Sequence, residues 1–116
     1  MEIIEYRTYR EEDILPLYAS VGWTAYTDAP DALRRGFEKS LLTLAAYEGK
    51  TLVGLARAVG DGETVVLVQD LLVFPQYQRL GVGTALLRAV MERFADVRQL
   101  QLVTDDTKKT LAFYHS

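Results

Sequence analysis

The spacing of hydrophobic and polar residues in the first third of the chain predicts one strand and two helices. Residues 3–9 mix β-branched and aromatic side chains with polar ones, which is typical of a strand. Residues 11–18 carry apolar side chains at helical spacing and acidic ones in the first turn, where the helix dipole favours negative charge. Residues 21–29 lack a clear period and predict a loop, and Asp31 is predicted to cap a helix that runs to about Lys39.

Three strands are predicted in the middle of the chain. Residues 41–47 and 51–59 are apolar runs separated by a Glu-Gly-Lys turn, which predicts a hairpin. A Gly-Asp-Gly turn then leads to a long strand at residues 64–73, which Pro75 ends because proline cannot donate to a β-ladder. The simplest arrangement is three antiparallel strands in succession.

The strongest helical pattern covers residues 81–94, where the apolar side chains form one stripe. A short strand follows at residues 99–103, and Asp105 or Asp106 is predicted to cap a last helix that contains Leu111, Ala112 and Tyr114. The element order is therefore β-α-α-β-β-β-α-β-α. It predicts the α/β (α+β) class, with a mixed, mostly antiparallel sheet flanked by helices and a right-handed parallel crossover around helix 81–94.

Length and composition narrow the class of protein. The 116 residues suffice for one domain, residues 1–116. The formal net charge is −3 and the 13 Lys and Arg residues are scattered, so nucleic acid is not expected as a partner. There is no cysteine and the one histidine is His115, so disulfides and cysteine nucleophiles are excluded and no metal site is predicted. No apolar run approaches the roughly 20 residues that span a bilayer, and the N-terminus lacks the order of a signal peptide, so no membrane contact and a cytoplasmic location are expected.

Residues 73–85 have the pattern of an anion-binding loop. A strand ends, a short loop with two glycines follows, and an amphipathic helix begins. Glycine lets a backbone approach a ligand closely, and a helix N-terminus presents unpaired N–H groups with partial positive charge. These features suit a pyrophosphate, to which Gln78, Arg79 and Thr84 can add side-chain donors.

Three kinds of phosphate-binding loop combine glycines with a helix N-terminus, and only one of them fits the spacing found here. A Walker A loop needs Gly-x-x-x-x-Gly-Lys-Ser/Thr, which does not occur. A dinucleotide fingerprint fails because Leu86 stands at its third small position and the loop follows a fourth strand. The pattern Gln/Arg-x-x-Gly-x-Gly/Ala matches Gln78-Arg79-Leu80-Gly81-Val82-Gly83 at every fixed position.

This hexapeptide resembles the acetyl-CoA-binding motif of the GNAT superfamily of N-acetyltransferases. Residues 69–77 look like the strand and lead-in that precede the loop in that family, and Leu111-Ala112-Phe113-Tyr114 looks like its late helix ending in Phe-Tyr. The element order also fits, so the likeness covers nearly the whole chain. It implies a GNAT-like sheet, acetyl-CoA as co-substrate, and direct transfer of an acetyl group to a primary amine of a small molecule or peptide.

The resemblance also implies roles for individual residues. The main chain of the strand would pair with the pantetheine arm, and backbone amides from Arg79 onward would hold the pyrophosphate. The residues so assigned to the cofactor are Leu71, Leu72, Val73, Gln78, Arg79, Leu80, Gly81, Val82, Gly83 and Thr84.

Two candidates for proton transfer follow from the same resemblance. Tyr114 matches the tyrosine that protonates the coenzyme A sulfur. Asp70 either takes the proton of the amine, through water, or serves as a structural hydrogen-bonding group, since an unpaired buried carboxylate is costly. Glu63 is a weaker candidate for the base.

Aromatic residues between the first two predicted helices are candidates for the acceptor site. Trp23 and Tyr26, with Tyr77, could line its mouth, and aromatic walls suit an amine that carries an apolar or cationic body.

The chain also departs from the family pattern. Thr107 stands where many members carry an asparagine, and the chain stops at Ser116, where the family continues with two further strands. We therefore expect a C-terminally incomplete domain, either a truncated form or a reduced variant that completes its sheet through a homodimer or an exchange of elements. A non-catalytic acyl-CoA-binding module and an interaction domain without a ligand are the alternatives to an enzyme. Thiol release with amines and a thermal shift with acetyl-CoA distinguish the three.

Overall fold

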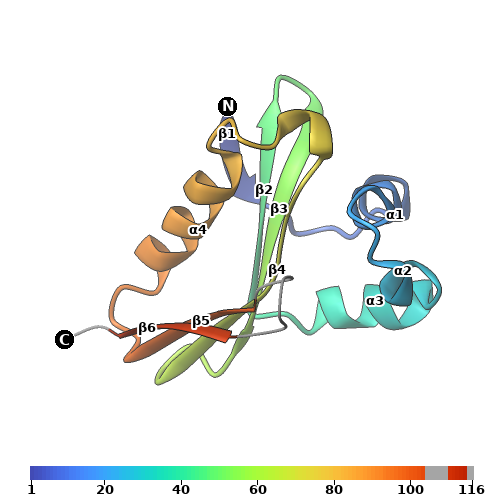
Figure 1. Ribbon diagram of the computed structural model, residues 1–116. Coiled ribbons are helices and arrows are strands. Elements are labelled where there is room, and N and C mark those ends of the chain that lie inside the picture. Colours follow the sequence, from blue (N-terminus) through green and yellow to red (C-terminus); the bar gives the residue numbers. More distant parts are fainter. Residues whose placement is uncertain (104–109, 115–116) are drawn as a thin grey trace.

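A single mixed sheet of six strands organises the structure (Figure 1). The computed structural model describes residues 1–103 and 110–114, the last five by their backbone. The strands lie in the order in which they follow along the chain, and every neighbouring pair is antiparallel except β4 and β5, which are parallel. The strands are β1 Glu2–Glu5, β2 Leu42–Glu48, β3 Thr51–Gly60, β4 Val65–Val73, β5 Gln99–Val103 and β6 Thr110–Tyr114.

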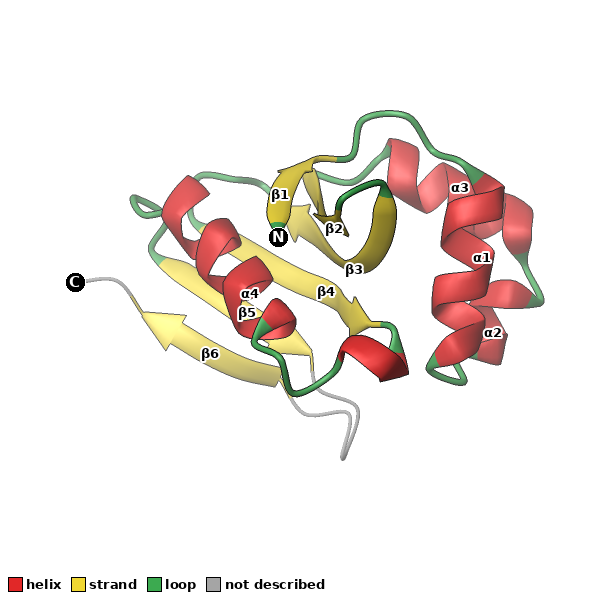
Figure 2. Ribbon diagram, turned by 90° about the horizontal axis from the view of Figure 1, so that it is seen from above, coloured by secondary structure: helices red, strands yellow, loops and turns green. Residues whose placement is uncertain are grey.

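Helices cover both faces of this sheet (Figures 1 and 2). One face carries α1 (Glu11–Ser20), the short α2 (Thr24–Thr27) and α3 (Pro30–Glu38), and the other carries α4 (Val82–Arg93). A 3-10 turn, η1 (Pro75–Tyr77), connects β4 to the loop before α4. The predicted class, a mostly antiparallel sheet flanked by helices, is confirmed.

The last predicted element is wrong, because residues 110–114 form a strand and not a helix. Thr110–Tyr114 pairs antiparallel with β5, from Val103 opposite Thr110 to Gln99 opposite Tyr114. This pairing gives β5 a second hydrogen-bonded neighbour, and a threonine with two aromatic residues suits a pleated strand. The proposed caps Asp105 and Asp106 lie outside the described residues.

The first half of the chain departs from its predicted boundaries in three places. The first strand ends at Glu5, and beyond it the Tyr6 hydroxyl accepts a hydrogen bond from the amide of Arg10 and donates one to Asp13, which holds the turn into α1. The predicted loop at 21–29 contains α2. The next helix starts at Pro30, whose fixed φ suits the first helical position, so that position 31 lies within the first turn.

Two apolar cores lie on opposite faces of the sheet, and a bulge in β4 decides which residues join each. The β3–β4 register passes from Arg57–Asp70 to Ala58–Val68, so Gln69 is an extra residue on β4. Val68 packs into the core beneath α4, whereas Leu72 packs into the core beneath α1 and α3. An unbroken strand keeps residues two apart on one face, so the bulge transfers the later part of β4 to the opposite side.

Glycine allows α4 to lie close to the sheet. A Cβ added at Gly54 on β3 would lie 3.0 Å from the Leu72 carbonyl oxygen, 3.0 Å from Val82 Cγ1 and 3.2 Å from Leu86 Cδ1. The absence of a side chain at Gly54 therefore allows the short distance between α4 and the sheet. Within the described residues, no helix combines the length and the apolar character that crossing a bilayer requires.

Candidate functional site

The strands β4 and β5 separate where the site begins. They pair only from Val65–Gln99 to Val68–Leu102. Beyond the bulge at Gln69, the edge of β4 that faces β5 has no strand partner among the described residues, although β3 still pairs with the other edge up to Val73. A bulge bends a strand and increases its twist, which accounts for the separation. The main chain of β4 beyond Gln69 therefore borders a gap in the sheet.

The loop between η1 and α4 is held in a conformation that gathers amide groups. Gly81 adopts φ 84° at the N-cap of α4, and Arg79 also has a positive φ, of 66°. The amide of Ala85 donates to the Gly81 carbonyl at 3.0 Å. Within the described residues, no turn, loop or cap hydrogen bond of 3.5 Å or less runs from an amide of residues 79–84 to a main-chain acceptor, and residues 78–81 lie in a turn. These amides meet at the positive end of the helix dipole, which is an anion-binding arrangement.

The side chains of the loop have three kinds of surroundings: one is bonded to the end of β4, two are exposed, and one is buried in the core. The Gln78 amide nitrogen donates to the Val73 carbonyl at 3.0 Å and so joins the loop to the end of β4. Leu80 is 70 % exposed, and Arg79 is exposed beside it. Val82, the first residue of α4, is buried in the core between this helix and the sheet, so it could reach a ligand only through its main chain.

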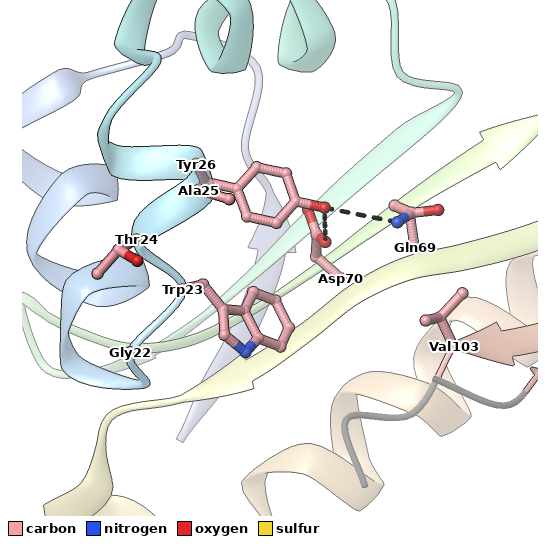
Figure 3. Close-up of a pocket in the computed structure, with 8 residues that line it drawn as sticks. All are labelled: Gly22, Trp23, Thr24, Ala25, Tyr26, Gln69, Asp70 and Val103. Atoms are coloured by element: carbon pink, nitrogen blue, oxygen red, sulfur yellow. Dashed lines mark hydrogen bonds between the residues drawn. The ribbon is translucent and has the colours of Figure 1, made fainter. Parts of the chain in front are cut away.

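A pocket of about 470 Å³ opens next to the gap between β4 and β5 (Figure 3). The structure brings together three residues that the sequence singled out, Trp23 and Tyr26 from the α2 region and Asp70 from β4. The pocket is also lined by Gly22, Thr24, Ala25, Gln69 and Val103, which the sequence did not single out.

Two weaker candidates lie elsewhere. Tyr77 lines a separate pocket of about 260 Å³ with residues of α1. Glu63 lies in the exposed turn between β3 and β4, where its amide donates to the Asp61 carboxylate at 2.8 Å. Three main-chain amides donate to that carboxylate and hold the pKa of Asp61 below its usual range.

Asp70 is 1 % exposed, and its two carboxylate oxygens have different partners. Oδ2 accepts hydrogen bonds from the Tyr18 hydroxyl at 2.6 Å and from Arg57 Nε at 2.7 Å. Oδ1 accepts one from the Tyr26 hydroxyl at 3.2 Å. The hydrogen-bonding role that the sequence left open for Asp70 is thus present, and a role in proton transfer stays a prediction.

Arg57 completes this buried network. Its Nη1 donates to Ser40 Oγ at 3.2 Å, and its guanidinium carbon lies 5.4 Å from the centre of the Phe37 ring. Burial opposes the charge of the guanidinium, but the Asp70 carboxylate outweighs burial, and the pKa of Arg57 is raised. Burial and then the charge of Asp70 raise the pKa of Tyr18, so its hydroxyl remains a donor.

Sequence reasoning missed Arg57 and Tyr18, although one signal was present. An arginine inside the apolar run of residues 51–59 needs a buried counter-charge, because an unpaired buried charge is costly. Asp70, inside the next apolar run, is the matching carboxylate. A search for such pairs would have linked the two.

Several predicted roles fall outside the described part of the structure. Tyr114 ends β6, but its side chain is not described, and Thr107 and His115 also lie outside. The role of Tyr114 as an acid therefore stays a prediction.

Comparison with known proteins identifies the family. The model of the acetyltransferase (GNAT) family matches residues 6–116. A GNAT family acetyltransferase, SP0256 from Streptococcus pneumoniae, has a solved structure that is 38 % identical, with a TM-score of 0.79 over 92 % of this chain and 77 % of that one. The paia N-acetyltransferase from Thermoplasma acidophilum, solved with coenzyme A, shares the fold at 16 % identity, with a TM-score of 0.70 over 94 % of this chain and 83 % of that one. The chain belongs to the GNAT acetyltransferase family.

A curated relative is longer than this chain. An uncharacterized N-acetyltransferase, ycf52-like, from Prochlorococcus marinus is 25 % identical over 95 % of this chain and 62 % of its own length. The chain thus spans about three fifths of that relative.

Proposed function

We propose that the protein is an N-acetyltransferase that uses acetyl-CoA and transfers the acetyl group directly to a primary amine of a small molecule or peptide. The main support is the group of amides at residues 79–84, from which no short turn, loop or cap hydrogen bond to a main-chain acceptor runs in the described part of the chain. A diphosphate bound there would accept hydrogen bonds from the backbone and lie at the positive end of α4. Exposed Arg79 and Thr84 stand at the rim and can add donors.

The gap beside β4 suits the rest of the coenzyme. In the proposed complex, the pantetheine arm runs along the free edge of β4 and pairs with main-chain groups of Leu71, Leu72 and Val73. From Val73 to Asp70 the strand covers about 10 Å at roughly 3.3 Å per residue. A thioester carried back along this edge would therefore come near the pocket of Trp23 and Tyr26.

The acceptor amine would approach from that pocket and attack the thioester carbonyl. Its nitrogen must lose a proton, and the coenzyme A sulfur must gain one. We assign no residue to protonation of the sulfur, because the register sets the main chain of Tyr114 opposite Gln99, at the end of β5 away from the gap. Arg57 and Tyr18 already donate to Asp70 Oδ2, so Oδ1, on the pocket side, is the oxygen that can accept a hydrogen bond from the amine. We therefore assign Asp70 to holding the amine, while water carries its proton away.

Calorimetric titration with acetyl-CoA, followed by an assay of thiol release across a panel of primary amines, tests this function. We expect saturable binding and thiol release with a subset of the amines. Binding without thiol release for any amine would favour a non-catalytic acyl-CoA-binding module. An absence of binding would contradict both.

We also propose that two copies associate through the outer edge of β6. Within the described residues, β6 pairs only with β5, so its other edge carries unpaired main-chain groups. Such an edge is a template for pairing with a second chain. Sedimentation equilibrium at micromolar concentrations should then show a dimer, and a monomer at every concentration would contradict this arrangement.

A further inference from the structure

The side chain of Gln78 bonds to the free edge of β4. Val73 lies opposite Gly54 in the β3–β4 register, and the amide of the next residue, Phe74, donates to β3 at the Val53 carbonyl. Opposite residues of an antiparallel pair alternate between bonded and non-bonded positions, so the main-chain groups of Val73 face away from β3. Gln78 Nε2 donates to the Val73 carbonyl at 3.0 Å. The side chain that the sequence predicted to bind a pyrophosphate is thus already bonded to the strand.

Arg79, the next residue, has an unfavourable backbone conformation. Its φ of 66° lies in the left-handed region, which only about a few per cent of residues other than glycine occupy. Arg79 is exposed, and its side chain makes no hydrogen bond or ion pair within the described part of the chain. Its own side chain therefore does not hold it in this conformation, which must depend on the residues on either side.

These neighbours are attached to the rest of the molecule in different ways. On the α4 side, Val82 is buried in the core between the helix and the sheet. On the β4 side, the amide of Gln78 donates to the Pro75 carbonyl at 3.2 Å, which joins it to η1 but not to the strand. Among the described residues, the bond from Gln78 to β4 is the one side-chain hydrogen bond that residues 78–84 make. Without this bond, Arg79 could move to the negative φ values that residues with a Cβ prefer.

We propose that Gln78 is a positioning residue, which holds Arg79 in its left-handed conformation by bonding to the Val73 carbonyl, so that the loop presents its amides to the diphosphate. The inference rests on the proposed function, since it takes the amides of residues 79–84 as the diphosphate site. A coenzyme binds only the molecules whose loop has this conformation, so a smaller fraction of them lowers the apparent affinity. The bond leaves the N–H of Val73 for the pantetheine arm.

Calorimetric titration of the whole chain with acetyl-CoA measures this contribution. Gln78→Met keeps the length of the side chain and removes its N–H donors, so the affinity for acetyl-CoA should fall by roughly three- to tenfold, as for the loss of one hydrogen bond. The matched control is Gln76→Met, because Gln76 is exposed in η1 and its side chain makes no hydrogen bond within the described residues. This control should keep the wild-type affinity.

A second background separates positioning from a direct bond between Gln78 and the coenzyme. Glycine adopts positive φ about as readily as negative φ, so Arg79→Gly needs no neighbour to hold the conformation. In the Arg79→Gly background, Gln78→Met should therefore weaken acetyl-CoA binding by less than about twofold. A side chain that bonded to the coenzyme directly would lose the same factor in both backgrounds, because independent contributions add.

Three results would overturn the inference: an unchanged affinity in Gln78→Met, the same loss in both backgrounds, or tighter binding in Gln78→Met. The last would mean that Gln78 competes with the coenzyme for the Val73 carbonyl. An absence of binding to the wild type would reject the proposed coenzyme site together with this inference. Binding to the wild type that does not depend on the side chain at position 78 would reject the inference alone and leave the proposed function intact.

Discussion

At the scale of single residues, the buried charge pair matters most for stability. Arg57 and Asp70 are 7 % and 1 % exposed and lie on neighbouring strands directly opposite one another. A buried ion pair contributes little net stability compared with an apolar pair, but the loss of one partner leaves the other charge uncompensated. The loss of either residue alone should therefore destabilise the folded protein.

The substitution Arg57→Met should lower the free energy of unfolding by about 3–5 kcal/mol, because Asp70 would remain buried without its counter-charge. Urea denaturation monitored by circular dichroism measures the change. Arg34→Met is the control, since Arg34 is half exposed and its ion pair with Asp31 spans 3.7 Å on the surface. The control should change stability by less than about 0.5 kcal/mol. Equal effects of the two substitutions would contradict the account of the network.

Tyr18 should make the protein less stable in alkali. Its folded-state pKa is raised by burial and then by Asp70, so the folded chain keeps a proton that the unfolded chain loses above about pH 10. The stability that this proton contributes is complete below pH 10 and is lost as the pH rises further. Tyr18→Phe should therefore reduce the fall in stability between pH 10 and 11 by about 1 kcal/mol.

Urea midpoints of the wild type and Tyr18→Phe at several pH values would reveal this difference. The wild type carries further tyrosines with raised pKa values, namely Tyr6, Tyr9 and Tyr47, so the variant should keep part of the slope. Parallel curves for the two proteins would show that Tyr18 titrates normally.

At the scale of elements, the contact between α4 and the sheet combines a structural and a functional requirement. Gly54 allows the helix to pack closely, while Gly83, in its first turn, borders the proposed diphosphate site. A Cβ at Gly83 would meet only Val73 Cγ2, at 3.8 Å, which is an ordinary contact. The two glycines should therefore respond oppositely to the same substitution.

Gly83→Ala should stabilise the protein and weaken coenzyme binding. Alanine is favoured over glycine in a helix by roughly 0.5–1 kcal/mol, and the structure has room for the methyl group. The same methyl group would hold a diphosphate away from the backbone amides, so the affinity for acetyl-CoA should fall by roughly tenfold, or about 1.4 kcal/mol. Thermal denaturation and calorimetry of one preparation measure both effects. Undiminished binding would exclude the amides as the diphosphate site.

Gly54→Ala should destabilise the protein by about 1–3 kcal/mol, because its methyl group would press on the Leu72 carbonyl and on Val82. Gly83→Ala is its matched control, with the same chemical change on the other side of one interface. A gain in stability from Gly54→Ala would mean that α4 can move away from the sheet at little cost.

At the scale of the whole molecule, the sheet carries two separate cores and the proposed site lies where β4 passes from one to the other. The bulge at Gln69 ends the pairing with β5 and turns Asp70 toward α1 and α2. In the proposed complex, the coenzyme therefore lies along the edge of β4 and the acceptor lies in the pocket beside α2. The two meet near Asp70. A ligand bound there would stabilise the folded state as a whole.

Acetyl-CoA at one hundred times its dissociation constant should stabilise the folded state by about 2.7 kcal/mol. For a domain of this size that corresponds to a rise in the thermal midpoint of roughly 10 °C. Differential scanning fluorimetry at a series of coenzyme concentrations measures the shift, and Gly83→Ala should need more coenzyme for the same rise. A constant midpoint at every concentration would contradict coenzyme binding.

The sequence alone determined the elements whose signals are local. The helix at 81–94, its glycine loop and the hairpin at 41–59 match α4, its N-cap at Gly81 and the pair β2–β3 within a few residues. Apolar periodicity, turn glycines and proline are properties of short segments, so they can be read without knowledge of the fold. Trp23, Tyr26 and Asp70 were candidates because the resemblance to the GNAT family implied roles for their positions.

Only the tertiary structure decided which faces and partners those residues have. The bulge at Gln69 moves Asp70 to the face of α1, although strict alternation would have kept it with Val68 beneath α4. Residues 110–114 lie as a strand because β5 provides an edge for them, and β5 takes its own place by pairing with β4 on the other side of α4 in the sequence. Register and edge pairing depend on contacts between distant segments, whose strength local patterns do not contain.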